Sequence, residues 1–95
     1  MAGGAYDDRD GLIWHNGEMV NWRDAKVHML THALHYGSSV FEGERAYNGV
    51  IFEGHRHSER LLDSGKAMDI PIPYSADQID AAKDEALKAS GLSDA

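Results

Sequence analysis

Short apolar runs around an Asn-Gly pair mark the start of the ordered chain. The run from Leu12 to His15 precedes Asn16-Gly17, and a second short run follows at residues 18–21. Asn-Gly between two such runs is the strongest short-range signal for a β-hairpin, because the tight turn requires positive φ at both central residues. The pattern therefore predicts strands near residues 12–15 and 18–21.

A second Asn-Gly pair, at residues 48 and 49, predicts another and longer hairpin. Apolar residues flank it on both sides, so we expect strands at roughly residues 39–47 and 50–53. Between the two hairpins the sequence AKVHMLTHALHYG alternates only loosely. It is compatible with a strand leading into one helical turn that ends at Gly37.

Helical periodicity dominates the second half. In GHRHSERLLDSGKAMDI, one stripe of a helix is formed by Ser58, Leu61, Leu62, Gly65 and Met68. A glycine inside a helix costs about 1 kcal/mol relative to alanine, but it permits close packing.

A second helix follows the extended PIPY. Its first residues form a capping box, with Ser75 as N-cap and Gln78 at N3, and the helix is expected to run to about Ser90 and to end at Gly91. The residues expected to face inward are Ile79, Ala82, Ala86 and Leu87. Strands followed by helices indicate an α+β fold: a small antiparallel sheet of hairpins with two C-terminal helices. We expect residues 1–11 to be a flexible tail and residues 12–95 to form one domain.

Charge and composition narrow the class of protein. The 95 residues carry 9 basic and 16 acidic side chains, a formal net charge of −7. This balance argues against a nucleic-acid or anionic membrane surface, and it favours a soluble protein. There is no cysteine, and the first residues lack the pattern of a signal peptide, so we expect a cytoplasmic location.

Three histidines are the first candidates for chemistry. His28, His32 and His35 are spaced by four and three residues, which on a helix places them on one face. Such a face binds zinc only with a further ligand, so the competing interpretation is a set of partly buried, hydrogen-bonded histidines. We predict no metal site.

A basic cluster opens the first long helix. His55, His57 and Arg60 are positioned either to meet an anion, since arginine is suited to bidentate phosphate contacts, or to form a solvated helix start. Local sequence favours the solvated start.

Alternation along residues 41–45 gives a third candidate. In a strand, Phe41, Gly43 and Arg45 share one face, and Glu42 and Glu44 share the other. An aromatic wall, a gap and a cation suit a small-molecule pocket, although a strand with a bulge at Gly43 fits as well. The two glutamates suit acid–base catalysis or, more commonly, an exposed strand face.

Residues 14–52, WHNGEMVNWRDAKVHMLTHALHYGSSVFEGERAYNGVIF, resemble the opening of a branched-chain amino-acid aminotransferase of the pyridoxal-phosphate-dependent fold type IV. ERLLDSGK and the IPYS helix are similar to its continuation, so that the resemblance covers about residues 12–95. The block HYGSSVFEGERAY separates this family from related D-amino-acid aminotransferases and aminodeoxychorismate lyases, which typically have a Gly-Asp-Gly type of motif in place of Phe-Glu-Gly. Gly65 stands where relatives commonly have alanine.

The resemblance implies a role for five residues. Tyr36 matches a tyrosine that reaches into the substrate pocket of a neighbouring subunit. Phe41 matches the aromatic wall of that pocket, Gly43 a close approach of backbone to substrate, and Arg45 the polar side. Arg60 matches the residue that binds the phosphate of pyridoxal 5'-phosphate.

The resemblance also implies what lies elsewhere. The family's Schiff-base lysine belongs to a second, larger domain, and Lys26, Lys66, Lys83 and Lys88 do not match it. We expect the last three to be solvated amines on helices, and no catalytic residue in this chain. The chain is thus expected to be the N-terminal small domain, present as a fragment, of a homo-oligomeric enzyme that transfers the amino group of Leu, Ile or Val to 2-oxoglutarate.

Two alternatives stay open at this point: another fold-type-IV enzyme, and a free-standing, non-catalytic binding module. In isolation, a face built to meet another domain leaves apolar surface exposed, so we expect the chain to associate.

Overall fold

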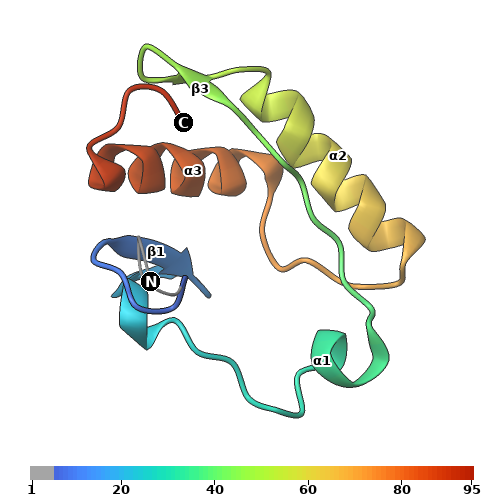
Figure 1. Ribbon diagram of the computed structural model, residues 1–95. Helices are drawn as coiled ribbons and strands as arrows, with labels where there is room; N and C mark the ends of the chain where they lie inside the picture. Colours follow the sequence, from blue (N-terminus) through green and yellow to red (C-terminus); the bar gives the residue numbers. More distant parts are fainter. Residues whose placement is uncertain (1–5) are drawn as a thin grey trace.

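The computed structural model describes residues 6–95, and the first part of the predicted tail, residues 1–5, lies outside that range. The elements in chain order are β1 (Leu12–His15), β2 (Glu18–Asn21), the 3-10 turn η1 (Trp22–Asp24), α1 (His32–Tyr36), β3 (Ala46–Tyr47), β4 (Val50–Ile51), α2 (Gly54–Ala67) and α3 (Ala76–Ser90). Figure 1 shows α2 and α3 side by side, with the β1–β2 hairpin against α3 and with α1 at the far end of a long connection.

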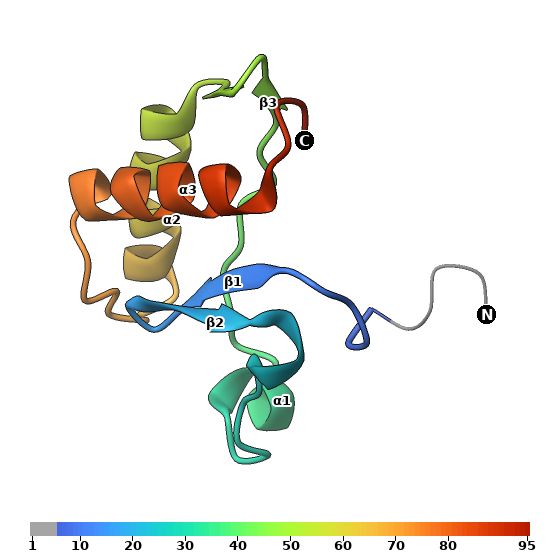
Figure 2. The ribbon, with the colours of Figure 1, turned by 90° about the vertical axis from the view of Figure 1, so that its left-hand side faces the viewer.

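The first hairpin has the predicted boundaries. Leu12 pairs with Asn21 and His15 with Glu18, antiparallel, and the turn residues Asn16 and Gly17 have φ of 51° and 95°. Asparagine and glycine tolerate this left-handed backbone better than other residues do, which is why the turn forms where the sequence predicts it. Seen from the side, the hairpin lies under α3 (Figure 2).

The second hairpin is much shorter than predicted. Only residues 46–47 and 50–51 pair, so the strand expected over residues 39–47 is wrong for 39–45. In the described part of the chain, residues 39–45 have no neighbouring strand to supply a ladder of hydrogen bonds. The free edge of β3 is taken by the end of the chain instead, where Ala46 N donates to Ala95 O at 2.7 Å and Ala95 N donates to Ala46 O at 3.1 Å.

The ambiguous stretch between the hairpins resolves into a single helical turn. α1 covers residues 32–36, and Gly37 ends it with φ of 71°, donating its N–H to Ala33 O at 3.0 Å. The residues before α1 form no strand. The predicted helical turn and its glycine stop are confirmed.

Both long helices are confirmed. The capping box of α3 is complete: Ser75 Oγ accepts from Gln78 N at 3.1 Å, and Gln78 Oε1 accepts from Ser75 N at 2.8 Å. Ser58 and Gly65 are the buried residues of α2, and Ala82 is the buried residue of α3. Ser58 lies at the contact with α3, where it bonds Asp80, whereas Gly65 faces Ile70 and Ile72 in the connection that follows α2.

The buried core of the described residues is small. Its apolar members are Ala46 and Ala82, whereas many large apolar side chains are exposed, among them Val27, Met29, Leu30, Leu34, Tyr36, Phe41, Phe52 and Met68. The radius of gyration is 14.4 Å, compared with about 12 Å expected for a compact domain of this length. Exposed apolar surface of this kind is typical of a contact with further protein.

The described part of the expected tail is not free of contacts. Arg23, in η1, donates to Asp8 at 2.8 Å and to Asp10 at 2.6 Å, and Trp22 N donates to Gly11 O at 2.9 Å. No helix within residues 6–95 is both long and apolar enough to cross a membrane.

Candidate functional site

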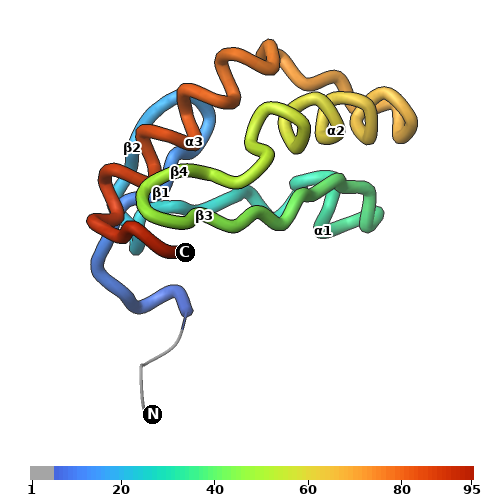
Figure 3. Tube along the Cα trace, turned by 90° about the horizontal axis from the view of Figure 1, so that it is seen from above, coloured from blue at the N-terminus to red at the C-terminus, as the bar shows by residue number. Residues whose placement is uncertain are grey.

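Residues 41–45 run as an extended segment beside α2, between α1 and β3 (Figures 1 and 3). Their side chains alternate although they form no strand. Phe41, Gly43 and Arg45 are exposed, whereas Glu42 and Glu44 are half-buried. The alternation predicted for a strand therefore survives, but the glutamates occupy the inner side, facing the helices.

Glu42 is held by two side chains of α2. Arg60 donates to its carboxylate through Nε at 3.0 Å and Nη2 at 2.7 Å, and His57 Nδ1 donates at 2.6 Å. The guanidinium of Arg60, followed by the imidazole of His57, lowers the pKa of Glu42 to about 2. The same pairing raises the pKa of Arg60 above its ordinary value.

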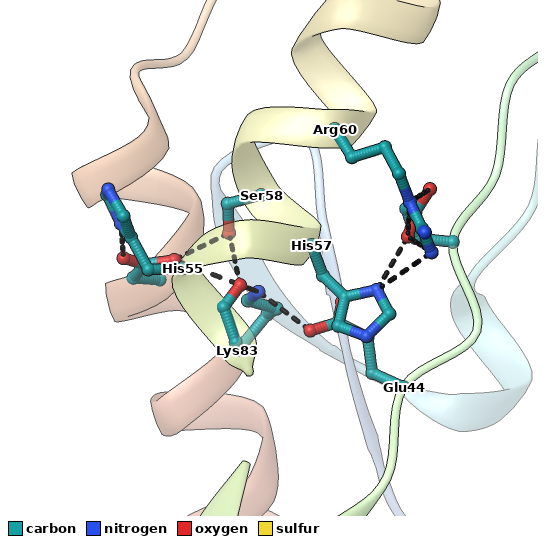
Figure 4. A network of polar contacts seen from close by, with 9 residues as sticks. Glu44, His55, His57, Ser58, Arg60 and Lys83 are labelled. Atoms are coloured by element: carbon teal, nitrogen blue, oxygen red, sulfur yellow. Dashed lines mark hydrogen bonds and ion pairs between the residues drawn. The ribbon is translucent and has the colours of Figure 1, made fainter. Parts of the chain in front are cut away.

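Glu44 is held from the other helix. Lys83 Nζ, on α3, donates to Glu44 Oε1 at 2.8 Å and to the carbonyl oxygen of Gly54 at 2.5 Å (Figure 4). The Lys83 side chain is only 18% exposed. The expectation that Lys83 is a solvated surface amine is therefore wrong, because the packing of α3 against the start of α2 encloses its ammonium group.

Asp80 completes this network one turn earlier on α3. Ser58 Oγ donates to its Oδ1 at 2.5 Å and His55 Nδ1 donates to its Oδ2 at 2.6 Å. The hydrogen bond from Ser58, followed by the one from His55, lowers the pKa of Asp80, and Asp80 in turn raises the pKa of His55. The two histidines of the predicted basic cluster thus bind acids of the chain itself: His57 contacts Glu42, and His55 contacts Asp80.

One group of side chains in the described residues has the composition of a metal site. Donor atoms of His55, Asp77 and Asp80 lie within 4.8 Å of one another. Asp80, however, already accepts from Ser58 and has the Lys83 ammonium 3.7 Å from its Oδ1. A fixed positive charge beside a ligand disfavours a cation, so the geometry favours an internal ion-pair network here.

The three histidines considered as metal ligands lie apart from this network. His28, His32 and His35 are exposed rather than partly buried, which corrects that expectation. His28 precedes α1 and its Nδ1 accepts from Leu30 N at 3.0 Å, while the His32 ring packs on the Tyr36 ring with centroids 4.7 Å apart.

The five residues named from the resemblance remain accessible. Tyr36 is 75% and Phe41 83% exposed. A side chain built at Gly43 has the Phe41 ring as its nearest neighbour, 4.0 Å away, and Arg45 is exposed. Phe41, Gly43 and Arg45 lie on one side of the segment, whereas Tyr36 is on α1 and Arg60 on α2. Arg45 and Arg60 line two different hollows of the surface.

Part of the Arg60 guanidinium is available to bind the phosphate of a cofactor. Its side chain is 66% exposed, and its hydrogen bonds within the described chain use Nε and Nη2. None of those bonds uses Nη1, so one edge of the guanidinium remains for an anion. The carboxylate of Glu42 fixes the orientation of that edge.

Sequence reasoning missed the partners of the two glutamates. The signal that was available is the pair of acids at positions 42 and 44, which requires two cations if the acids face inward. No local pattern identified Arg60 and Lys83 as those cations, because they lie 18 and 39 residues away.

No family model matches the chain. Individual proteins do: the chain is 50% identical over 92 residues to a branched-chain-amino-acid aminotransferase of Pseudomonas aeruginosa, covering 93% of this chain and 30% of that protein. It is 46% identical over 87 residues to the enzyme of Escherichia coli K12, covering 87% and 28%.

Solved structures show the same similarity. A structure of the branched-chain amino acid aminotransferase from Escherichia coli superimposes with a TM-score of 0.86 at 43% identity, covering 90% of this chain and 30% of that one. Another enzyme of the same name, complexed with N-(5'-phosphopyridoxyl)-L-glutamate, gives a TM-score of 0.84 at 39% identity with the same coverage.

The chain therefore has the fold seen at one end of the fold-type-IV aminotransferases, an α+β arrangement of small antiparallel sheets and helices. Within that class it is a homologue of the branched-chain-amino-acid aminotransferases. It spans about 30% of the length of the relatives it matches.

Proposed function

We propose that this chain is the N-terminal part of a pyridoxal-phosphate-dependent enzyme that transfers the amino group of Leu, Ile or Val to 2-oxoglutarate. The observation that carries the proposal is 50% identity over 92 residues to an enzyme named for this activity, together with the matching fold. When bound, pyridoxal phosphate supplies the electron sink that amino-group transfer needs.

The residues of this chain would bind the cofactor phosphate and orient the substrate. Arg60 presents its free edge to the phosphate of the cofactor, because a guanidinium forms charge-assisted hydrogen bonds to phosphate oxygens. Phe41 provides the apolar wall for a branched side chain, and Gly43 lets the backbone approach it. Arg45 meets a polar group of the substrate, and Tyr36, on α1, reaches toward the pocket of a second subunit.

The exposure of these residues supports an assembled enzyme. Tyr36 and Phe41 expose most of their surface in the chain alone, at a cost that a second domain and a second subunit would remove. We propose a homo-oligomer on this basis. We propose a cytoplasmic location from the acidic, cysteine-free composition. We expect the Schiff-base lysine in a domain that follows, so the isolated chain should not catalyse transamination.

The first experiment separates activity of the whole enzyme from activity of this chain. The full-length protein, loaded with pyridoxal phosphate, should transaminate leucine, isoleucine and valine faster than D-alanine. The 95-residue chain with pyridoxal phosphate should not exceed the rate of the free cofactor. Preference for a D-amino acid, or turnover by the short chain, would contradict the proposal.

The second experiment tests the phosphate contact. Arg60→Gln in the full-length protein should weaken cofactor binding about 10- to 100-fold, the effect of losing a charged hydrogen bond of roughly 1.5–3 kcal/mol. Arg56→Gln is the matched control, because Arg56 lies on the same helix, is 81% exposed and only approaches Glu53 at 3.5 Å. Equal loss in both variants would reject Arg60 as the phosphate ligand.

A further inference from the structure

The path of residues 41–45 depends on side chains rather than on a backbone ladder. Within the described residues no strand pairs with this segment, since β3 begins only at Ala46. Its inner side chains, Glu42 and Glu44, are each bound to a cation on a different helix. Arg45 also accepts one backbone hydrogen bond, from Phe52 N at 2.8 Å. The two ion pairs and this single bond therefore determine which way the segment faces.

Of the two cations that hold the segment, Lys83 makes contacts with more parts of the chain. Its ammonium group bridges three parts of the chain: α3, on which it lies, the first residue of α2 through Gly54 O, and the segment through Glu44 (Figure 4). Its side chain is 18% and that of Glu44 is 20% exposed, so solvent competes weakly with the pair. One turn earlier on α3, Asp80 bonds Ser58 and so fixes α3 against α2.

The alternation of side chains links the Lys83–Glu44 pair to Gly43 and Arg45, the residues proposed to face the substrate. In an extended segment, a side chain that points inward at position 44 requires positions 43 and 45 to point outward. If Glu44 is released, rotation of the backbone turns Gly43 and Arg45 away from their direction. The Glu42–Arg60 pair still holds the other end, so the disturbance concentrates at residues 43–45.

We propose that Lys83 is a positioning residue for substrate binding, acting through Glu44 to hold Gly43 and Arg45 toward the substrate. The inference rests on the proposed aminotransferase function for its kinetic consequence, whereas the anchoring of residues 43–45 stands on the contacts alone. Lys83 touches neither substrate nor cofactor in this scheme.

The test uses Lys83→Met in the full-length protein, which keeps the length of the side chain and removes its charge. The control is Lys88→Met, an exposed position on the same helix. In Lys83→Met the KM for leucine should rise about tenfold, within the range of coupling between contacting residues, while cofactor affinity changes less than about twofold. Amide hydrogen exchange in the cofactor-free protein should accelerate at Phe52, whose N–H donates to Arg45 O at 2.8 Å and is released when residues 43–45 turn.

Two further variants identify the contact responsible. Lys83→Arg should restore KM to within about threefold of the wild type, because the guanidinium still reaches a carboxylate. Glu44→Gln combined with Lys83→Met should raise KM no more than Lys83→Met alone, because both changes remove the same pair.

The following results would contradict the proposed role of Lys83. An unchanged KM in Lys83→Met, or an equal rise in Lys88→Met, rejects a positioning role. Faster exchange spread throughout α2 and α3 would show a general loss of stability instead. If the wild-type enzyme shows no transamination, the proposed function fails, and the exchange of the Phe52 amide alone decides whether Lys83 anchors the segment.

Discussion

Replacing Gly65 by alanine tests whether close packing determines the end of α2. A Cβ at this buried position would lie 2.8 Å from Ile72 Cδ1 and 2.9 Å from Ile70 O. Carbon atoms normally approach to about 3.5 Å and a carbon meets a carbonyl oxygen at about 3.3 Å, so both neighbours must move. The Ile72 side chain can rotate, but Ile70 O belongs to a backbone that also donates its N–H to Gly65 O at 2.8 Å.

The expected change in stability on Gly65→Ala is the balance of two opposing effects. Alanine in place of glycine stabilises a helix by at most about 1 kcal/mol, and by less in a last turn. Overpacking of a close contact costs roughly 1–3 kcal/mol. Gly65→Ala should therefore destabilise the protein by about 1–2 kcal/mol.

Urea unfolding followed by tryptophan fluorescence measures this change. Trp14 reports on the affected region, because its ring packs edge-on against Tyr74 with centroids 5.2 Å apart. Lys66→Ala, exposed in the same turn, is the control and should change stability by less than about 0.5 kcal/mol.

A second-site change identifies the clash. Ile72→Val removes Cδ1 and should cost about 0.5–1.5 kcal/mol when residue 65 is glycine. It should cost less when residue 65 is alanine, because it then relieves the contact. A Gly65→Ala protein as stable as the wild type would refute the argument from close packing.

Three further predictions concern the cap and the ion pairs. Ser75→Ala should destabilise the protein by about 1 kcal/mol through loss of the capping box, measured by urea unfolding, and an effect below about 0.3 kcal/mol would contradict the role of the cap. Because pairing with Arg60 lowers the pKa of Glu42 from 4.5 to about 2, its contribution to stability is present above pH 4.5 and is lost as the pH falls toward 2. Glu42→Gln should flatten this acid limb of the stability profile, and an unaltered limb would reject the pairing. Asp80 raises the pKa of His55, so this stabilisation is present below about pH 6.5 and is lost as the pH rises through the raised pKa. In an NMR titration, Asp80→Asn should move the His55 pKa back toward 6.5, and no movement would contradict the contact.

Local chemistry made the first hairpin and the boundaries of α3 predictable. Asn16-Gly17 specifies a turn through two adjacent positions, and Ser75 with Gln78 caps α3 through contacts three residues apart. Such signals act within one turn of chain, so they need no knowledge of the rest of the protein. That Phe41, Gly43 and Arg45 share one side was likewise predictable, since alternation is a property of any extended backbone. Which side faces outward was not, because the sequence favoured exposed glutamates and the structure turns Glu42 and Glu44 inward.

The length of the second hairpin was not predictable in the same way. Residues 39–45 have the composition of a strand, but a strand exists only where a neighbour supplies hydrogen bonds. Pairing is a non-local property, and in this chain the edge of β3 meets the C-terminal residues 93–95 instead.

The sequence by itself determined the order of the elements, their turns and caps, and the resemblance to a family of enzymes. Only the tertiary structure decided what the inner charges do. It brings Lys83 to Glu44 across 39 residues and Arg60 to Glu42 across 18, and it turns a predicted surface lysine into an enclosed ion pair. The physical reason is that a charge removed from water needs an opposite charge nearby, and the packing of α2, α3 and the extended segment selects which one.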